Sequence, residues 1–162
     1  YSYMDTLTNT YNRRKFEETL QEIIESQYMS VFTVVLFDVD AFKHINDTYG
    51  HAAGDYTLKE ICELVRIKLK NENTSGQLFR YGGDEFFIIF RNNREEEVKE
   101  IIGGIVDMVS TYDFKYEKNS FKASISVGAV EVVDTQEQQE IINDVDKKLY
   151  IAKSKGKNQV VY

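Results

Sequence analysis

The sequence predicts an α/β fold, an α+β sandwich in which helices pack on a mixed sheet. Segments with apolar residues at helical spacing alternate with short β-branched and aromatic segments. One pair of strand-like segments flanks a Gly-Gly pair, which is typical of a β-hairpin. The chain has 162 residues, and no linker, repeat or low-complexity segment divides it. Residues 1–162 are therefore expected to form a single domain.

The first half of the chain is expected to contain three helices and one central strand. Apolar residues at helical spacing predict a helix over about residues 12–27. The run 31–37 is nearly all apolar, as in a strand that is covered on both faces. A short helix is expected over about 41–48, where Gly50 stops it, and a longer helix after residues 54–55.

The second half opens with a hairpin and ends with a helix and a short strand. Residues 77–81 and 85–91 are its two expected strands, and a polar loop at 71–76 precedes them. Apolar spacing predicts a helix over 98–112, although Gly103 and Gly104 inside it weaken helix formation. Residues 121–133 are strand-like, 141–152 form a last helix that Gly156 ends, and 158–162 form a final strand.

Composition and charge limit the possible partners. The net charge of −7 argues against a general nucleic-acid surface and against direct contact with an anionic membrane. A small anionic ligand is compatible with it, because local lysines and a metal ion outweigh the global field. The single cysteine, Cys62, is expected at the core edge of a helix and favours a reducing, cytoplasmic location. Residue 1 is not methionine, so the chain is interpreted as a piece of a longer multidomain protein, whose membrane attachment stays open.

Acidic residues occur in two short segments, one at the end of the expected central strand and one at the hairpin turn. Asp38 and Asp40 close an apolar strand and point to the same side of an extended chain. Asp84 and Glu85 lie at the hairpin turn. If the hairpin lies beside the strand, four carboxylates converge, and they repel one another unless a cation neutralises them. Oxygen ligands without a Cys or His cluster favour Mg²⁺ or Mn²⁺. The alternative is that they are ordinary turn residues.

Two further groups of polar residues admit two interpretations each. Asn46 and Asp55 suit a guanine edge, because a carboxylate accepts from the two adjacent N–H donors of guanine. The alternative for Asp55 is the N-cap of the next helix, which composition alone favours. Lys153 and Lys157 flank the end of the last helix. They are either partners of the helix dipole or ligands of phosphate groups.

Four ordered blocks of this sequence resemble one family, the GGDEF-domain diguanylate cyclases. The hairpin reads RYGGDEFF at 80–87, and the chain opens with DTLTNTYNRRKF at 5–16. The segment FDVDAFKHINDTYGHAAGD at 37–55 resembles the metal and guanine segment of the family. The segment VDKKLYIAKSKGKN at 145–158 resembles its closing helix and phosphate contacts. The resemblance covers almost the whole chain with its spacing intact.

The resemblance implies a fold, a reaction and partners. The fold is a palm-like mixed sheet related to nucleotidyl cyclases, in which the hairpin carries the GGDEF signature. The reaction is the condensation of two GTP molecules into cyclic di-GMP, a bacterial second messenger, with release of two pyrophosphates. Each 3′-hydroxyl attacks the α-phosphorus of the other GTP. One domain holds one GTP, so a homodimer is needed for catalysis.

The resemblance also implies a role for individual residues. Asp38, Asp84 and the backbone carbonyl of Val39 are the expected magnesium ligands. Glu85 is the expected base for the attacking hydroxyl, beside a second metal. The expected nucleotide contacts are Asn46 and Asp55 at the guanine, His51 and Leu58 near the nucleoside, Gly82 and Gly83 under the approaching nucleotide, and Phe42, Lys43, Lys153 and Lys157 along the triphosphate.

The chain departs from the family pattern at three places. Asn9 and Thr10 stand where glycine and leucine are usual, which is expected to alter packing beneath the base. Lys157 replaces the usual arginine and lacks its bidentate fork. The Arg-x-x-Asp motif of the product-inhibition site is absent at 73–76. The alternatives to a cyclase are a GGDEF-like module that binds GTP or a dinucleotide without catalysis, an enzyme that joins adenine and guanine nucleotides, and a structural dimerisation domain.

Overall fold

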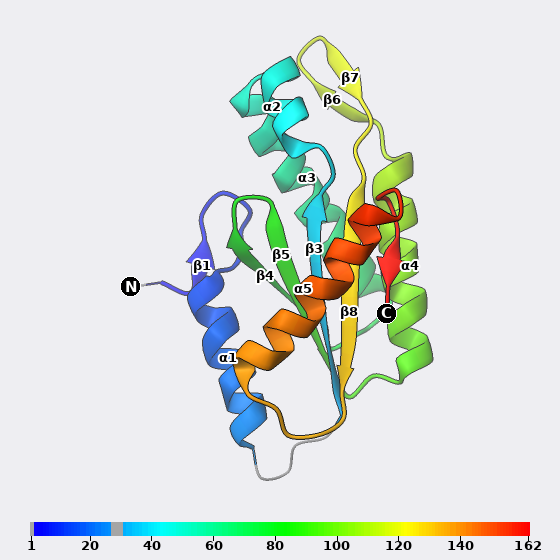
Figure 1. Cartoon of the computed structure of the whole chain (residues 1–162). Coiled ribbons are helices and arrows are strands. Elements are labelled where there is room, and N and C mark those ends of the chain that lie inside the picture. The colour runs from blue at the N-terminus through cyan, green and yellow to red at the C-terminus, as the bar shows by residue number, and fades with distance from the viewer. Residues whose placement is uncertain (1, 27–30) are drawn as a thin grey trace.

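The computed structural model describes residues 2–26 and 31–162, and they form helices on both faces of a twisted sheet (Figure 1). The elements in chain order are β1 (Met4–Asp5), β2 (Thr10–Tyr11), α1 (Arg13–Glu25), β3 (Phe32–Val39), α2 (Phe42–Tyr49), α3 (His51–Asn71), β4 (Gln77–Gly82), β5 (Glu85–Arg91), α4 (Glu95–Thr111), β6 (Phe114–Tyr116), β7 (Asn119–Phe121), β8 (Ile125–Val132), α5 (Gln138–Ser154) and β9 (Val160–Val161).

The main sheet is mixed, as predicted. Its strand order is β1-β2-β4-β5-β3-β8-β9, and β6 and β7 form a separate two-stranded hairpin. The central strand β3 runs antiparallel to both of its neighbours, β5 and β8. The outer strands β2 and β9 join β4 and β8 in parallel. The β4–β5 hairpin therefore lies directly beside β3, which is the condition for the acidic segments to meet.

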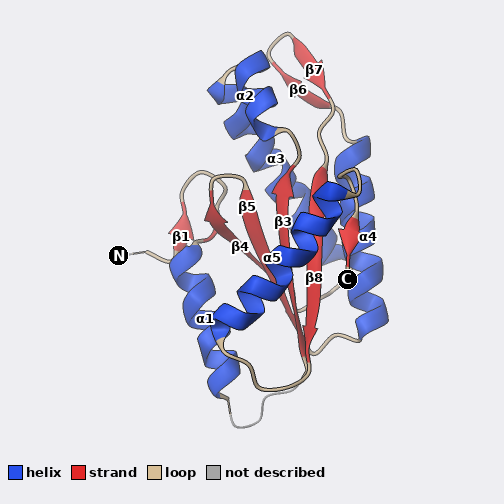
Figure 2. Cartoon of the chain, in the orientation of Figure 1, coloured by secondary structure: helices blue, strands red, loops and turns tan. Residues whose placement is uncertain are grey.

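Each face of the sheet has its own helical layer (Figure 2). Phe32, Val34 and Leu36 of β3 pack with α1 and α5 in one apolar cluster. Val35, Phe37 and Val39 of the same strand pack with α3 and α4 in the other cluster. This alternation is the two-residue period of a strand. Asp38 continues the first series and therefore faces α5.

The predicted helix after residues 54–55 begins earlier in the structure. Gly50 is at once the C-cap of α2 and the N-cap of α3, with φ 95° and ψ 160°. This positive φ suits glycine, and it allows α3 to begin at His51. Asp55 thus lies inside the helix, and its interpretation as an N-cap was wrong.

The predicted strand over 121–133 is two strands. β7 ends at Phe121 and β8 begins at Ile125, and the residues between them belong to neither strand. Lys122 Nζ donates to Asp113 at 2.8 Å, and the carbonyl oxygen of Ser124 accepts from the backbone N–H of Asp40 at 2.9 Å. The strands β1, β2 and β6 were missed, because two or three residues are too few for a recognisable period. The first helix ends at Glu25, and residue 27 of its predicted range lies outside the described residues.

The other predicted elements keep their type and shift at their ends. β3 continues two residues past its prediction, to Val39, and the final strand is shorter than predicted, at Val160–Val161. Cys62 is 0% exposed and lies inside the core instead of at its edge. Burial raises the pKa of its thiol to about 12. Among the described residues, no helix combines the length and the apolar composition needed to cross a bilayer.

Close packing of α5 on β8 depends on Gly128. A Cβ at this position would lie 2.5 Å from the backbone nitrogen of Leu149 and 2.6 Å from the carbonyl oxygen of Val145. Both atoms belong to the backbone of α5, so the helix would have to move away from the sheet. The position of α5 matters because the helix carries Lys153 one turn further on.

Gly128→Ala is expected to destabilise the fold by about 1–3 kcal/mol, because the added methyl group pushes α5 from the sheet. Gly103→Ala is the matched control, because a Cβ there meets nothing within 4 Å. The control is expected to stabilise α4 by about 1 kcal/mol through helix propensity. Urea unfolding measures both changes, and a Gly128→Ala variant as stable as the wild type would contradict the packing argument.

Candidate functional site

Three of the predicted carboxylates meet where β3 ends beside the β4–β5 turn. Asp38 and Glu85 are direct partners in the β3–β5 register. Phe87 and Ile89 of β5 belong to the cluster with α1 and α5, so alternation places Glu85 on the same face as Asp38. Asp84 is half-buried in the turn next to Glu85. The predicted convergence of these two segments is therefore confirmed.

Asp38 is the most buried of these carboxylates and is only half satisfied. The residue is 5% exposed. Its Oδ2 forms an ion pair with Nζ of Lys153, from the last turn of α5. Its Oδ1 is buried and accepts no hydrogen bond from any residue that the structure describes. A buried carboxylate oxygen without a partner is costly, and such an atom is suited to a metal ion or a proton.

The surroundings raise the pKa of all three carboxyl groups. Burial raises the pKa of Asp38 to about 6, against the opposing effect of Lys153, and the charges of Asp84 and Asp40 add to the rise. Burial likewise raises the pKa of Asp84, although backbone N–H groups and Lys153 oppose it. The pKa of Glu85 is raised by burial and then by nearby negative charge. Crowded, desolvated carboxylates are typical of functional sites.

Lys153 is the cation that faces this cluster. Burial lowers its pKa, but the hydrogen bond and the charge of Asp38 outweigh burial, and the pKa is raised. Its side chain is 41% exposed, so Nζ has a route to solvent as well as to Asp38. The sequence alone favoured a role as a dipole partner, whereas the structure places the ammonium group inside the carboxylate cluster.

Asp40 has a different role from its neighbours. Its Oδ1 accepts from Ser126 Oγ at 2.5 Å, and its Oδ2 accepts from Ser124 Oγ at 2.6 Å. Oδ2 also accepts from the backbone N–H of Asn158 at 3.1 Å. These bonds tie the end of β3 to β8 and to the segment after α5. The sequence predicted that Asp40 converges with the other carboxylates, but both of its oxygens accept hydrogen bonds from within the protein.

The residues fit a magnesium ion that is shared with a ligand. Within residues 2–26 and 31–162, no three His, Cys, Asp or Glu side chains are placed to hold a metal by themselves. Mg²⁺ sites in phosphate-handling proteins use one or two carboxylates, and substrate phosphates and water supply the remaining oxygens. Asp38 and Asp84, with the backbone of Val39, provide a donor set of that kind. The unpartnered Oδ1 of Asp38 is the atom that best supports this fit.

The start of α2 lies next to the carboxylates and suits an anion. Ala41 precedes the helix in the left-handed region, with φ 52° and ψ 37°, and no side chain caps the helix. Uncapped N–H groups at a helix start bind anions. Lys43 is exposed there, and its Nζ lies 3.8 Å from Oδ2 of Asp47. The exposed Lys157 lines a cavity together with Asp40 and Ala41, directly before the helix. Phe42 is half-buried at the first position of α2.

The predicted base-binding residues lie on the helix pair α2–α3. The side chain of Asn46 rests on Gly54, where a Cβ would come within 1.8 Å of Oδ1 of the asparagine. Asp55 follows Gly54 and is exposed, as is His51 at the start of α3. Leu58 is 1% exposed and belongs to the core, so it supports this region from within the protein.

Gly82 and Gly83 leave space at the turn itself. Both are exposed, and a Cβ at either would meet no atom within 4 Å. Gly83 has φ 53°, in the left-handed region that suits glycine. The backbone of the turn is therefore open to a ligand from outside.

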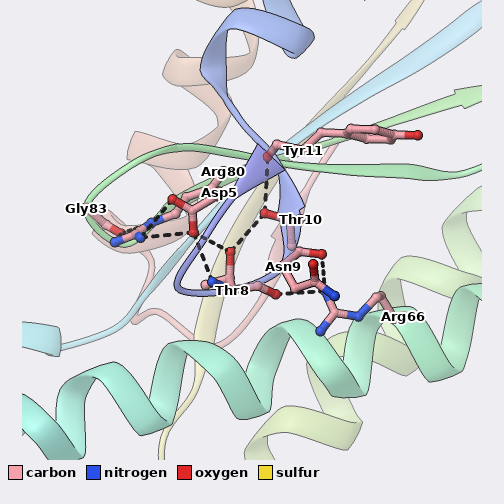
Figure 3. A network of polar contacts seen from close by, with 8 residues as sticks. All are labelled: Asp5, Thr8, Asn9, Thr10, Tyr11, Arg66, Arg80 and Gly83. Carbon is pink, nitrogen blue, oxygen red and sulfur yellow. Dashed lines mark hydrogen bonds and ion pairs between the residues drawn. The ribbon is translucent and has the colours of Figure 1, made fainter. Parts of the chain in front are cut away.

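A polar network that sequence reasoning missed holds this turn (Figure 3). Nε and Nη2 of Arg80 donate to the carbonyl oxygen of Gly83 at 3.0 and 2.8 Å. Nη1 of Arg80 donates to the carboxylate of Asp5, with 3.2 Å to Oδ2. The same Oδ2 accepts from Thr8 Oγ1 at 2.7 Å. The opening segment is thereby fastened to the acidic turn, and the one available signal was a charged residue between the apolar residues Phe79 and Tyr81.

The unusual Asn9 belongs to this network and does not lie under the predicted base site. Its φ is 55°, a left-handed conformation that Asn tolerates better than most residues. Arg66 of α3 donates to the carbonyl oxygens of Thr8 and Asn9 at 2.9 and 3.2 Å. Thr10 is buried and its hydroxyl lies 2.9 Å from that of Thr8. The replacements of the usual glycine and leucine thus keep the turn that the network needs.

Asp38→Asn is expected to stabilise the metal-free protein at pH 8 by on the order of 2 kcal/mol. The pKa of Asp38 in the folded protein, about 6, lies above its ordinary value of 3.8. The folded state therefore binds this proton more tightly, so the carboxylate costs stability as pH rises from about 4 to about 6 and above. Below about pH 4 both states are protonated, and the gain disappears.

Denaturant unfolding in EDTA between pH 4 and pH 8 measures this gain. The exposed Asp134→Asn variant is the matched control, and it is expected to show no pH-dependent gain. An Asp38→Asn variant that is less stable than the wild type at pH 8 would contradict the assignment.

Arg80→Ala is expected to destabilise the fold by about 1–3 kcal/mol, because it leaves Asp5 and the Gly83 carbonyl without their partner. The side chains of Arg80 and Asp5 are 18% and 22% exposed. Arg94, which pairs with Glu97, is 78% exposed and provides the control. Arg94→Ala is expected to cost much less, because solvent screens an exposed ion pair. Thermal unfolding compares the two variants, and equal effects would count against the network.

Comparisons with known proteins agree with this architecture. A family model described as "Diguanylate cyclase, GGDEF domain" matches residues 2–159. Diguanylate cyclase DgcS of Shewanella oneidensis is 35% identical over 157 residues, which cover 95% of this chain and 50% of that protein. An uncharacterised membrane protein of Staphylococcus aureus strain USA300 is 30% identical over 164 residues, which cover 98% of this chain and 45% of that protein. The chain thus spans about half the length of these curated relatives.

Solved structures share the fold closely. Diguanylate cyclase SiaD of Pseudomonas aeruginosa, in complex with its activator SiaC, superposes with a TM-score of 0.91 at 29% identity, over 99% of this chain and 61% of that one. The GGDEF domain of DgcB from Caulobacter crescentus, in complex with c-di-GMP, gives a TM-score of 0.91 at 25% identity, over 99% of this chain and 95% of that one. The expected palm-like sheet of nucleotidyl cyclases is confirmed. The match along almost the whole sequence and the shared fold show that this chain belongs to the GGDEF domain family.

Proposed function

We propose that this chain is a diguanylate cyclase domain, which condenses two GTP molecules into cyclic di-GMP and releases two pyrophosphates. One observation carries the proposal: the family's acidic signature is intact and lies against the buried, half-satisfied Asp38. The proposal places the activity in the cytoplasm, where GTP is available.

Asp38, Asp84 and the Val39 carbonyl are proposed to hold Mg²⁺ or Mn²⁺ beside the triphosphate. The metal, when bound, supplies charge neutralisation at the phosphates. Lys153 already lies in the cluster, and its exposed side gives Nζ access to a phosphate oxygen. Phe42 and Lys43 at the uncapped start of α2, with Lys157, are proposed to bind the rest of the triphosphate.

Glu85 is proposed to accept the proton of the attacking 3′-hydroxyl. Its pKa is raised by burial and by neighbouring acidic groups, which moves it towards the range of an effective general base. Its position opposite Asp38 in the register places it beside the proposed metal site. Each domain supplies one nucleotide, so two copies are proposed to face each other during the reaction.

The guanine is proposed to lie on the α2–α3 pair, next to Asn46 and Asp55. Asn46 is held against Gly54, which fixes the direction of its amide. The carboxylate of Asp55 is exposed and accepts from two adjacent N–H donors, which guanine has and adenine lacks. This pairing favours a product with two guanines over a mixed adenine–guanine dinucleotide.

Incubation of the purified chain with GTP, ATP and Mg²⁺, followed by mass spectrometry, tests the proposal. We expect cyclic di-GMP without cyclic GMP-AMP, and a rate per domain that rises with protein concentration because the site needs two copies. Glu85→Gln is expected to lower kcat about 10²–10⁴-fold with little effect on GTP binding. Glu100→Gln, at an exposed position of α4, is the matched control.

The outcomes separate the alternatives. Tight GTP binding without product at every protein concentration would favour a non-catalytic binding module. Neither binding nor product would favour a structural domain, and cyclic GMP-AMP would contradict the assignment of Asp55.

Product feedback through the family's inhibition motif is expected to be absent. The segment 73–76 lacks both the arginine and the aspartate of that motif. Activity titrated with cyclic di-GMP is therefore expected to show competition with GTP only. Strong non-competitive inhibition would contradict this expectation.

A further inference from the structure

The two helices that carry the proposed base contacts are joined by a single residue. α2 ends at Tyr49, α3 begins at His51, and Gly50 alone separates them. Gly50 is exposed, and a Cβ there would meet no atom within 4 Å, so no side chain packs against the outer side of the joint. The angle between the helices therefore depends on contacts made elsewhere along their length.

The β6–β7 hairpin contacts α2 through one aromatic pair. Tyr49 stacks on Phe121 of β7, with ring centroids 4.5 Å apart and planes at 16°. Tyr49 lies three residues after Asn46, so the two side chains belong to adjacent turns of one short helix. The hairpin lies beside α2 at the end of the molecule to which β3 points (Figure 1).

The same hairpin contacts α3 through Tyr56. The backbone N–H of Lys115 in β6 donates to the hydroxyl of Tyr56 at 3.0 Å. The ring of Tyr56 also meets the ring of Tyr116, with centroids 5.4 Å apart. Tyr56 directly follows Asp55 in the chain. One side chain of each helix, next to its proposed base contact, is thus fastened to the hairpin.

The two contacts are connected inside the hairpin. Phe114 of β6 and Phe121 of β7 are direct partners in the hairpin register. Their rings are stacked, with centroids 5.7 Å apart and planes at 12°. The rings of Phe114 and Tyr56 are perpendicular to each other, with centroids 6.4 Å apart. A continuous aromatic path therefore joins Tyr49 on α2 to Tyr56 on α3 through the hairpin.

We propose that the β6–β7 hairpin is a strut that sets the angle between α2 and α3, and that Tyr49 and Tyr56 are positioning residues for guanine discrimination. The inference rests on the proposed function, because it concerns the same nucleotide site. Guanine discrimination needs Asn46 and Asp55 to reach one base together. A change of the helix angle alters their separation while each residue stays intact, and the second contact is then lost.

A purely structural role for these aromatic residues predicts something different. Loss of packing would lower the stability of the chain and weaken all nucleotides alike. The strut predicts a selective loss, because inosine lacks the 2-amino group and offers Asp55 only one N–H donor. ITP therefore lacks one of the two hydrogen bonds that GTP donates to Asp55. The ratio of the ITP to the GTP dissociation constant thus measures whether Asp55 reaches the base.

The test compares Tyr49→Leu, Tyr56→Phe and the double variant with the wild type, by calorimetric titration with GTP and ITP in Ca²⁺ to suppress turnover. Tyr162→Phe is the matched control, because it removes a tyrosine hydroxyl that donates to a backbone carbonyl, that of Lys99, at 3.2 Å. Thermal unfolding of each variant records any loss of stability. Tyr56→Phe is a conservative change that keeps the ring, so it provides a folded variant.

The double variant is expected to lower the ratio of the ITP to the GTP dissociation constant about three- to tenfold, because GTP loses one hydrogen bond to Asp55 more than ITP does, while the control keeps the wild-type ratio. An unchanged ratio in the folded double variant would overturn the strut and leave the proposed function intact. A wild-type chain that binds GTP and ITP equally would overturn both the strut and the guanine assignment.

Discussion

The arrangement of this domain depends on a carboxylate at the end of its central strand. Asp38 continues a series of buried apolar residues on β3, and the alternation of the strand directs it into the layer between the sheet and α5. A charge in this position needs a partner, and Lys153 supplies one to only one of its two oxygens. Burial raises the pKa of Asp38 to about 6, so the fold maintains this charge at the expense of stability. On the proposed function, the unpartnered oxygen of Asp38 is the one that takes the cation.

Several distant parts of the chain serve to keep this corner in place. Gly128 lets α5 approach the sheet closely enough for its last turn to reach Asp38. Asp40 accepts hydrogen bonds from the β8 region and from the segment after α5, and these bonds connect the end of β3 to both. Arg80 fastens the acidic turn to the opening segment (Figure 3). On the proposed function, this corner serves the phosphate and metal chemistry, while the helix pair α2–α3 serves recognition of the base.

Much of this could be predicted from local sequence, and the failures have physical causes. The long helices and the hairpin follow from strong periodicity, and the convergence of Asp38 with Glu85 follows once the hairpin lies beside β3. The ion pair of Lys153 with Asp38 joins residues 115 positions apart, so no local pattern could indicate it. The same holds for Arg80 and Asp5, which are 75 positions apart. The division of 121–133 was missed because the three residues between β7 and β8 are too few to interrupt a strand pattern clearly. The start of α3 was missed because it depends on the φ angle of Gly50.

The claim that Asp38 accepts a cation in exchange for Lys153 can be tested directly by a crystal structure of this chain with Mg²⁺ and a non-hydrolysable GTP analogue. We expect a metal ion between Oδ1 of Asp38 and the carboxylate of Asp84, with Nζ of Lys153 turned from Asp38 towards a phosphate oxygen. A structure in which the analogue is bound, while Lys153 stays paired with Asp38 and no metal contacts Oδ1, would contradict it.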